Sequence, residues 1–265
     1  MGIKRVKLFP NNNEESLRVA KRLGSKLIDF GYEIVNDNYD LAIAIGGDGS
    51  FLRMVKGNQF DSDIYYIGVN TGTLGFLQEI KPSEIDLFLD KLRNEFYKIE
   101  KVGIQETKIV TKDREAKVYS LNEIAIRDRN FRITNLRVCV DDELLGIYTG
   151  DGLLVATSIG STAYNVSLNG SIVYGDLHTL QITPIAPLKN DAYHNLANSV
   201  VIPENKVIRI VPLKNNRDLM MLIDGEIFNL EDVKEVETSV SKRKIKCLRM
   251  NDYNYTKIIH DKLLK

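Results

Sequence analysis

Residues 41–50 have the sequence LAIAIGGDGS, an apolar run that passes directly into a glycine-rich loop. A short, continuous apolar run is typical of a strand buried on both faces of a parallel sheet. A helix-like segment, 51–55, follows the loop. In α/β sheets, ligands bind where the carboxyl end of a parallel strand opens into a helix. Residues 41–55 therefore predict an α/β layer with a ligand site at the loop.

Strand-like and helix-like patterns alternate on both sides of this loop, from residue 1 to about residue 100. Asn13 follows a turn and is suited to cap a helix, which is expected to stop at Gly31. The spacing places four apolar residues of this helix on its buried face: Leu17, Ala20, Leu23 and Leu27. A second buried strand is expected over 64–69, and Ser83 is expected to cap a further helix.

The pattern changes after about residue 100 to short segments rich in β-branched residues. Asp224-Gly225, between two apolar runs, is a strong hairpin signal. The fold class is therefore α/β plus β: an open, nucleotide-binding-like α/β domain over 1–100 and a mainly antiparallel β-domain over 101–250. Helical spacing returns in 251–265, which is expected to pack back on the first domain.

Composition excludes several classes of protein. The 265 residues carry 36 basic and 36 acidic side chains, so no net charge draws the chain to nucleic acid or to an anionic membrane. No apolar run reaches the roughly 18 residues of a membrane span, and residues 1–6 lack the apolar core of a signal peptide. Two cysteines and three scattered histidines form neither a disulfide framework nor a zinc signature. We expect a cytoplasmic protein.

The glycine-rich loop is suited to phosphate chemistry. Glycines let the backbone approach a phosphate closely, and the amides at a helix start complement its charge. The loop has no lysine of the P-loop type, so donor phosphates would need Mg²⁺ and basic side chains from elsewhere. A carboxylate beside phosphate is costly unless it handles a proton or a metal, which singles out Asp48. The structural alternative is that Asp48 only caps the helix, but a second glycine-rich loop over 71–76 favours a cleft.

Three clusters in the second half also carry polar groups suited to ligand binding. Asn122-Glu123 interrupts a strand-like stretch, although such a pair is often structural. Gly150-Asp151-Gly152 is open to interpretation as a hairpin turn. Residues 157–167 place hydroxyls and Tyr164 just after a strand, which suits a sugar and a base but also a polar helix start.

The motifs GGDGS, TGTLGF, the Asn-Glu pair and GDG(x)₇GSTAY, in this order and spacing, resemble the NAD kinase family. The resemblance runs from about residue 41 to about residue 226. It implies phosphorylation of the adenosine ribose 2′-hydroxyl of NAD by ATP, with Mg²⁺ or another divalent cation on the donor. Asp48 would be the catalytic general base. The donor phosphates would lie against Gly46, Gly47, Gly49 and Ser50.

The resemblance also implies which residues bind NAD. Asn122 and Glu123 would hold the dinucleotide, and Phe76 would pack near the substrate adenine. Asp151, Ala186 and Pro187 would line the nicotinamide end, partly from a neighbouring subunit of a homodimer or homotetramer. The remaining NAD contacts would come from the two glycine loops and the segment after residue 157: Asp48, Gly49, Ile159, Thr162, Ala163, Tyr164 and Ser167.

The chain departs from the family pattern at several positions. Ser50 replaces the usual Thr and keeps its hydroxyl. Ser158-Ile159 stands where Pro followed by Thr or Ser is usual, and Thr149 stands where some members carry Arg. Asn169 and Ser171 interrupt a usual Gly-Gly-Pro. These changes bear on the fit around the adenine and leave the reaction class unchanged.

Two other functions stay open from the sequence. One is a kinase of another nucleotide or of a lipid head group, because such enzymes share the GGDG loop. The other is a non-catalytic NAD(P)-binding sensor, which the changes at Ser158-Ile159 suggest and the intact Asp48 loop opposes.

Overall fold

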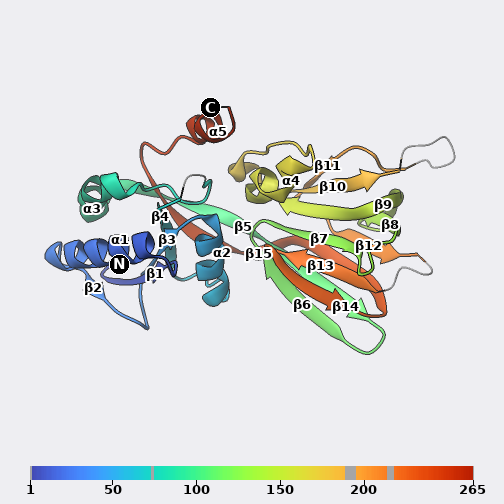
Figure 1. Ribbon diagram of the computed structural model, residues 1–265, viewed down its shortest axis with the longest axis horizontal. Helices are drawn as coiled ribbons and strands as arrows, with labels where there is room; N and C mark the ends of the chain where they lie inside the picture. Colours follow the sequence, from blue (N-terminus) through green and yellow to red (C-terminus); the bar gives the residue numbers. More distant parts are fainter. Residues whose placement is uncertain (1, 73–74, 189–194, 214–217, 265) are drawn as a thin grey trace. The chain divides into compact units, whose positions relative to one another are not determined.

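The structure is a computed structural model that describes residues 2–72, 75–188, 195–213 and 218–264. The chain divides into two compact units (Figure 1). Unit 1 comprises Met1–Val102 and Lys244–Lys265, and unit 2 comprises Gly103–Arg243. From the family resemblance, the β-domain over 101–250 would be the part that binds NAD, and this stays a prediction.

Unit 1 is built on a parallel sheet with the strand order β2-β1-β3-β4. The four strands are Arg5–Pro10 (β1), Glu33–Ile34 (β2), Leu41–Gly46 (β3) and Tyr65–Asn70 (β4). β3 lies between β1 and β4 and is buried along its whole length. The apolar run 41–45 therefore forms the central strand that its sequence predicts.

Helices cover both faces of this sheet. α1 (Glu14–Asp29) and α3 (Ile85–Arg93) share one apolar cluster with Leu41, Ile43 and Ile45 of β3. α2 (Asp48–Gly57) packs against β3 without joining that cluster. Because side chains alternate between the two faces of a strand, the face opposite the cluster carries only the small Ala42 and Ala44, which leaves room for a close helix.

Two details of these helices correct the sequence analysis. Leu17, expected on the buried face of α1, is 48% exposed. Ser16 is buried instead, because its hydroxyl lies 2.8 Å from the Thr71 hydroxyl. Ser83 does not cap α3 but lies inside a 3₁₀ turn, Pro82–Glu84, that runs directly into the helix.

Unit 2 is antiparallel throughout its paired strands, with β9 (Glu143–Thr157) at its centre. The first part of β9 pairs with β8, and its second part lies between β7 and β10. The other strands of this unit or reaching into it are Tyr97–Thr111 (β5), Glu115–Ser120 (β6), Glu123–Asp128 (β7), Thr134–Val140 (β8), Thr179–Pro187 (β10), Val200–Pro203 (β11), Ile208–Pro212 (β12), Leu219–Ile223 (β13), Glu226–Leu230 (β14) and Val233–Met250 (β15).

Two features of unit 2 differ from what local sequence suggests. The hairpin-turn alternative for Gly150-Asp151-Gly152 is wrong, because these residues lie inside β9. β15 does not belong to the β-domain alone, because Lys246 and Cys247 pair in parallel with Tyr65 and Tyr66 of β4. Its apolar residues continue past Arg243, so the strand extends into unit 1.

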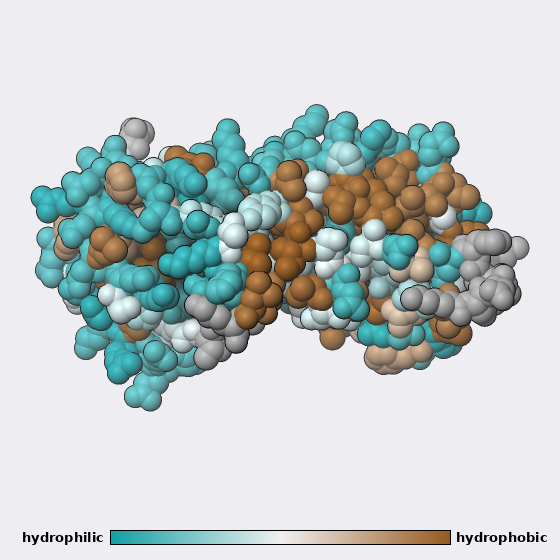
Figure 2. All heavy atoms as spheres, turned by 90° about the horizontal axis from the view of Figure 1, so that it is seen from above, coloured by the Kyte–Doolittle hydropathy of each residue, from teal (hydrophilic) through white to brown (hydrophobic). Residues whose placement is uncertain are grey.

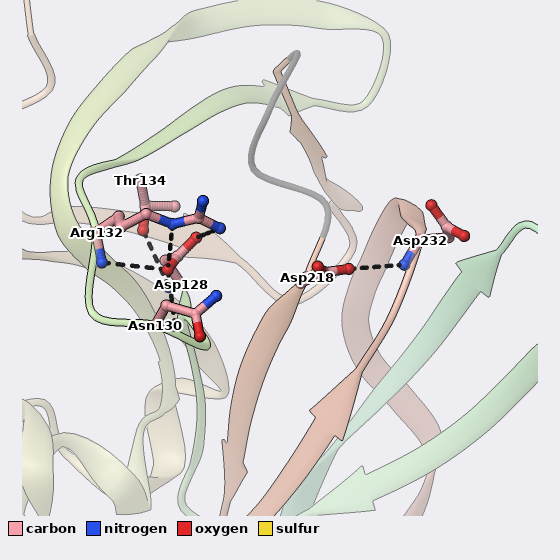
Figure 3. A network of polar contacts seen from close by, with 6 residues as sticks. All are labelled: Asp128, Asn130, Arg132, Thr134, Asp218 and Asp232. Atoms are coloured by element: carbon pink, nitrogen blue, oxygen red, sulfur yellow. Dashed lines mark hydrogen bonds and ion pairs between the residues drawn. The ribbon is translucent and has the colours of Figure 1, made fainter.

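Two connections in unit 2 are tight turns that involve an aspartate. Asp224-Gly225 forms the predicted hairpin between β13 and β14, with φ values of 48° and 83°. The turn after β7 is organised by the fully buried Asp128, which accepts hydrogen bonds from the backbone N–H of Asn130 and Arg132 and pairs with the Arg132 guanidinium at 3.1 Å (Figure 3). Local hydrogen bonds thus hold the ends of the strands in place.

The C-terminal helix α5 (Tyr255–Leu263) belongs to unit 1, as expected. Asn254 caps it by accepting a hydrogen bond from the Lys257 N–H. Within the described part of the chain, no helix is both long enough and apolar enough to span a membrane.

Candidate functional site

In unit 1, three loops meet at the carboxyl edge of the parallel sheet. They follow β1, β3 and β4, and two backbone hydrogen bonds join them. Asn11 N–H donates to the Ile45 carbonyl at 2.7 Å, and Thr71 N–H donates to the Gly46 carbonyl at 3.0 Å. Adjacent parallel strands therefore bring the two glycine-rich loops together. Thr73 and Leu74 of the second loop lie outside the described residues.

Asp48 is the first residue of α2 and faces the second loop. Its carboxylate accepts hydrogen bonds from the backbone N–H of Phe76 at 2.8 Å and of Leu77 at 3.0 Å. Burial raises the pKa of Asp48 above its usual range, while the two amides and the Lys262 charge oppose that shift. Asp48 does not cap its helix, since no side chain caps α2. A buried carboxylate with a raised pKa is suited to accept a proton.

Two glycines are required here because other groups approach them closely. A Cβ on Gly46 would lie 2.2 Å from Ser50 Oγ, and a Cβ on Gly75 would lie 3.0 Å from Asp48 Oδ1. Gln78 ties the second loop to the first by donating a hydrogen bond to the Gly47 carbonyl. The glycines thus let the two loops pack tightly around the Asp48 carboxylate.

A basic side chain lies at the first loop, as the missing lysine led us to expect. The exposed Arg53 donates hydrogen bonds to Asn11 Oδ1 at 3.0 Å and to Ser50 Oγ at 3.1 Å. The sequence pattern indicates the need for a basic side chain here but does not by itself identify Arg53. The spacing from Gly49 to Arg53 is the signal, because residues four apart lie on the same face of a helix.

In unit 2, Asn122 and Glu123 lie at the start of β7 and are held by Asp224. The Asp224 carboxylate accepts hydrogen bonds from the backbone N–H of Leu121, Asn122 and Glu123, at 2.8, 2.7 and 3.2 Å. From the sequence, Asp224 is predicted only as a turn residue. A contact between residues about a hundred positions apart has no local signal that would have revealed it.

The Glu123 side chain is buried and incompletely paired. The Tyr164 N–H donates to its carboxylate, but Oε2 accepts no hydrogen bond from any residue that the structure describes. Burial raises the pKa of Glu123 to about 8, and the nearby Asp224 charge adds to the shift. A buried oxygen without a partner is unusual in a folded protein and suits a ligand that donates a hydrogen bond.

The segment after β9 packs against Asn122. The Thr157 N–H donates to the Asn122 carbonyl at 2.8 Å, and a Cβ on Gly160 would lie 1.9 Å from that same carbonyl oxygen. Asn165 is fully buried and donates to the carbonyls of Ser161 and Ser171. Hydrogen bonds of these kinds fix the backbone around residues 157–165.

This segment brings together five of the predicted NAD contacts. A 3₁₀ turn, Ile159–Thr162, leads into a one-turn helix, Tyr164–Ser167. The expected helix start is therefore present, and NAD binding by this segment stays a prediction. Ile159 and the residues from 162 to 164 are half-buried, and Ser167 is exposed. All of them therefore keep some accessible surface, close in the chain to the amide that contacts Glu123.

The three residues predicted to line the nicotinamide end also lie together, on β9 and β10. Gly152 pairs with Ile185 and Gly150 pairs with Pro187, so Asp151 and Ala186 lie between these two pairs on adjacent strands. Asp151 is exposed, and its carboxylate lies 3.5 Å from the Arg127 guanidinium. Phe76, by contrast, lies in unit 1, buried beside Asp48.

Comparison with known proteins assigns the chain to a family. Residues 6–97 match the ATP-NAD kinase N-terminal domain, and residues 121–250 match the ATP-NAD kinase C-terminal domain. The chain is 37% identical over 269 residues to an NAD kinase of Finegoldia magna, covering 98% of this chain and 97% of the relative. The chain belongs to the NAD kinase family. Similarity to an NAD kinase 2 of Halalkalibacterium halodurans, 29% over 245 residues, covers 91% of this chain and 90% of that one.

Solved structures of NAD and NADH kinases share the fold. Yeast NADH kinase, in complex with NADH, superposes with a TM-score of 0.85 at 19% identity, covering 98% of this chain and 87% of the yeast chain. An NAD kinase from Archaeoglobus fulgidus, in complex with ATP, gives a TM-score of 0.74 at 23% identity, covering 93% and 94%. The α/β plus β fold class predicted from the sequence is therefore confirmed.

Proposed function

We propose that this NAD kinase family member transfers the γ-phosphoryl group of ATP to the 2′-hydroxyl of the adenosine ribose of NAD, giving NADP. The observation that carries the proposal is the buried Asp48 carboxylate, held by two amides at the start of α2 in a family whose N-terminal domain covers this loop. A bond forms between the 2′-oxygen and the γ-phosphorus as the bond to the bridging oxygen breaks. ADP leaves, and the hydroxyl proton passes to Asp48.

The first glycine loop supplies the donor side of this proposal. Gly46, Gly47 and Gly49 leave the backbone open to phosphate oxygens, and the α2 amides complement their charge. Ser50 contributes a hydroxyl and Arg53 a guanidinium, which suits bidentate contact with phosphate. Positioning and charge neutralisation are the main protein contributions to phosphoryl transfer.

The divalent cation belongs to the donor in this proposal. Each oxygen of Asp48 accepts one backbone hydrogen bond and keeps a lone pair for the hydroxyl proton, so the proposal does not need Asp48 to bind the metal. Among the residues the structure describes, no three His, Cys, Asp or Glu side chains are grouped to hold a metal ion. Mg²⁺ bound to ATP would neutralise charge on the transferred phosphate.

Unit 2 supplies the groups proposed to hold the dinucleotide. The unpaired Glu123 oxygen and the Asn122 amide offer hydrogen bonds to a sugar or amide group, and Tyr164 offers an aromatic ring. Thr162, Ala163, Ser167 and Ile159 add hydroxyl, backbone and apolar contacts nearby. Asp151, Ala186 and Pro187 are proposed for the nicotinamide end. The cytoplasmic location remains a prediction from the sequence.

The test is NADP formation from NAD, ATP and Mg²⁺, with Asp48→Asn beside the wild type. We expect the variant to lose about 10²–10⁴-fold in rate, because an amide cannot accept the proton. Asp63→Asn, an exposed carboxylate of the same unit, is the matched control and should keep wild-type turnover. An Asp48→Asn variant with more than a tenth of the wild-type rate would refute the general-base role.

The same assay separates the other two functions. A wild type that binds NAD or NADP but forms no NADP from ATP would support the sensor. A substrate panel in which NAD is inert and another nucleotide or a lipid head group is phosphorylated would support the related kinase.

We also propose that the chain forms a homodimer or homotetramer through unit 2. Figure 2 shows apolar side chains gathered over one face of this unit. Three residues of β9 contribute exposed apolar surface to unit 2: Leu144 is 60% exposed, Leu145 37% and Ile147 44%. An apolar sheet face of this kind is typical of an interface.

Light scattering at micromolar concentration tests the assembly. We expect more than one subunit for the wild type and a shift towards monomer for Leu144→Glu/Ile147→Glu. Leu87→Glu, which changes an equally exposed leucine of unit 1, should keep the wild-type mass. A monomeric wild type would contradict the proposal.

A further inference from the structure

Behind the Asp48 loop lies a buried group of charges that the proposed chemistry does not use. Arg249, near the end of β15, has only 5% of its side chain exposed. Its Nε donates to Glu100 at 2.6 Å, and its Nη1 lies 3.9 Å from Glu79 Oε2. Its guanidinium also lies 4.5 Å from the centre of the Tyr253 ring. Removing the charges of Arg249, Glu100 and Glu79 from water costs free energy, which only close pairing between them can offset.

Glu79 connects this group to the catalytic loop. Its Oε1 accepts a hydrogen bond from the Met250 N–H at 2.8 Å, and its side chain is 10% exposed. Glu79 lies three residues after Phe76 and two after Leu77, whose amides hold the Asp48 carboxylate. Gly75 and Gln78, which contact the Asp48 loop, line the same cavity of about 230 Å³ as Glu79 and Met250.

The segment that contains Glu79 is also anchored to the first loop through Gln78 and to β4 through its backbone. The Ile80 N–H donates to the Gly68 carbonyl, and the Asn70 N–H donates to the Ile80 carbonyl, which fixes the segment to β4. Glu79 adds the contact to β15, on the other side of the segment. The pair of amides at 76 and 77 is thus attached to two strands of the sheet.

We infer that Glu79 is a positioning residue, which through Met250 and Arg249 fixes the segment whose amides orient the Asp48 carboxylate. The inference rests on the proposed function of Asp48 as a base. Glu79 itself touches no reacting atom. The attachment matters because a displacement of about 1 Å at a catalytic group is enough to cost about 100-fold in rate.

Glu79→Gln tests this inference, because it keeps the shape of the side chain and removes its charge. We expect kcat to fall about 10-fold with the KM for NAD within two-fold of wild type. The second readout is hydrogen exchange at the Phe76 and Leu77 amides, which should become about 10-fold faster relative to the Ile43 and Ile45 amides of β3. Glu33→Gln, an exposed carboxylate in β2, should change neither.

Glu79→Asp covers the case in which the Gln variant does not fold. It keeps the charge but shortens the side chain, so we expect a smaller loss of kcat and smaller changes in exchange. A folded Glu79→Gln or Glu79→Asp protein with wild-type exchange at residues 76 and 77, or with wild-type kcat, would overturn the inference. Failure of the wild type to form NADP would instead refute the proposed function, and the exchange readout does not depend on it.

Discussion

Glu123 illustrates how a single carboxyl group is controlled by its surroundings. Burial and the Asp224 charge raise its pKa to about 8, so the group is largely protonated at neutral pH. A protonated carboxyl can donate a hydrogen bond as well as accept one. Glu123 is therefore suited to donate a hydrogen bond to a ligand oxygen as well as to accept one, while Asp224 holds its backbone N–H and adds to the pKa shift that burial causes.

Asp224→Asn is predicted to lower the pKa of Glu123, because the substitution removes the neighbouring negative charge. The Glu123 pKa should move from about 8 towards its ordinary range. The KM for NAD should rise, because the hydrogen bonds from the backbone N–H groups of residues 121–123 to residue 224 become weaker. Titration of the Glu123 carboxyl by ¹³C NMR measures the first effect and steady-state kinetics the second.

Asp218→Asn is the matched control, because Asp218 lies at the other end of β13 (Figure 3). It should leave the Glu123 titration unchanged. An unchanged Glu123 pKa in Asp224→Asn would contradict the electrostatic explanation.

At the scale of elements, the 3₁₀ turn Ile159–Thr162 depends on its close approach to β7. The position of Gly160 is fixed by two linked hydrogen bonds. The Gly160 N–H donates to Thr157 Oγ1 at 3.0 Å, and the Thr157 hydroxyl donates to the Leu121 carbonyl at 2.6 Å. These contacts leave no space for a side chain on Gly160. The turn and the Asn122-Glu123 pair therefore form one packed structure.

Gly160→Ala is predicted to destabilise the protein by about 1–3 kcal/mol or more, because its Cβ would overlap the Asn122 carbonyl. Binding of NAD should weaken at the same time, since residues 122 and 123 must move. Urea unfolding and calorimetric titration with NAD measure the two effects. Gly146→Ala in β9 is the control, because a Cβ there would meet no atom within 4 Å. Equal stability of the two variants would contradict the packing argument.

At the scale of the whole molecule, two buried carboxyls in different units affect stability in the same direction. Burial raises the pKa of Glu79 to about 7 and that of Glu123 to about 8, from ordinary values near 4.5. Both groups therefore bind protons more tightly when the chain is folded. Their contribution to stability is fully present below pH 4.5 and is lost as the pH rises through 7 and 8.

The free energy of unfolding is predicted to fall between pH 5 and pH 8, by at most about 1.4 kcal/mol per pH unit for each group. Glu79→Gln/Glu123→Gln should show a flatter profile, because an amide does not titrate. Urea unfolding at several pH values measures this. A double variant with the slope of the wild type would show that these carboxyls do not cause the pH dependence.

Much of the fold and part of the site could be predicted from local sequence. The Asn13 cap and the apolar spacing after it gave the limits of α1, and the run 41–45 gave the central strand. The motifs around Asp48, Asn122 and Gly160 indicated the family. Errors arose where tertiary contacts override local pattern: Ser16 is buried by its bond to Thr71, and Gly150–Gly152 continue a strand because adjacent strands pack closely against them.

The alternation of helices and strands in the first hundred residues, the two glycine-rich loops and the family could all be predicted from the sequence. Each of these depends on residues close together in the chain, whose spacing and chemistry are visible in the sequence. The long-range contacts, by contrast, are visible only in the folded chain: amides 28 and 29 residues away hold Asp48, and Asp224 holds Asn122 from 102 residues away. The pairing of β15 with β4 is a further contact of this kind. Such contacts depend on the chain folding back on itself, and backbone hydrogen bonds between distant residues leave no periodicity in the sequence.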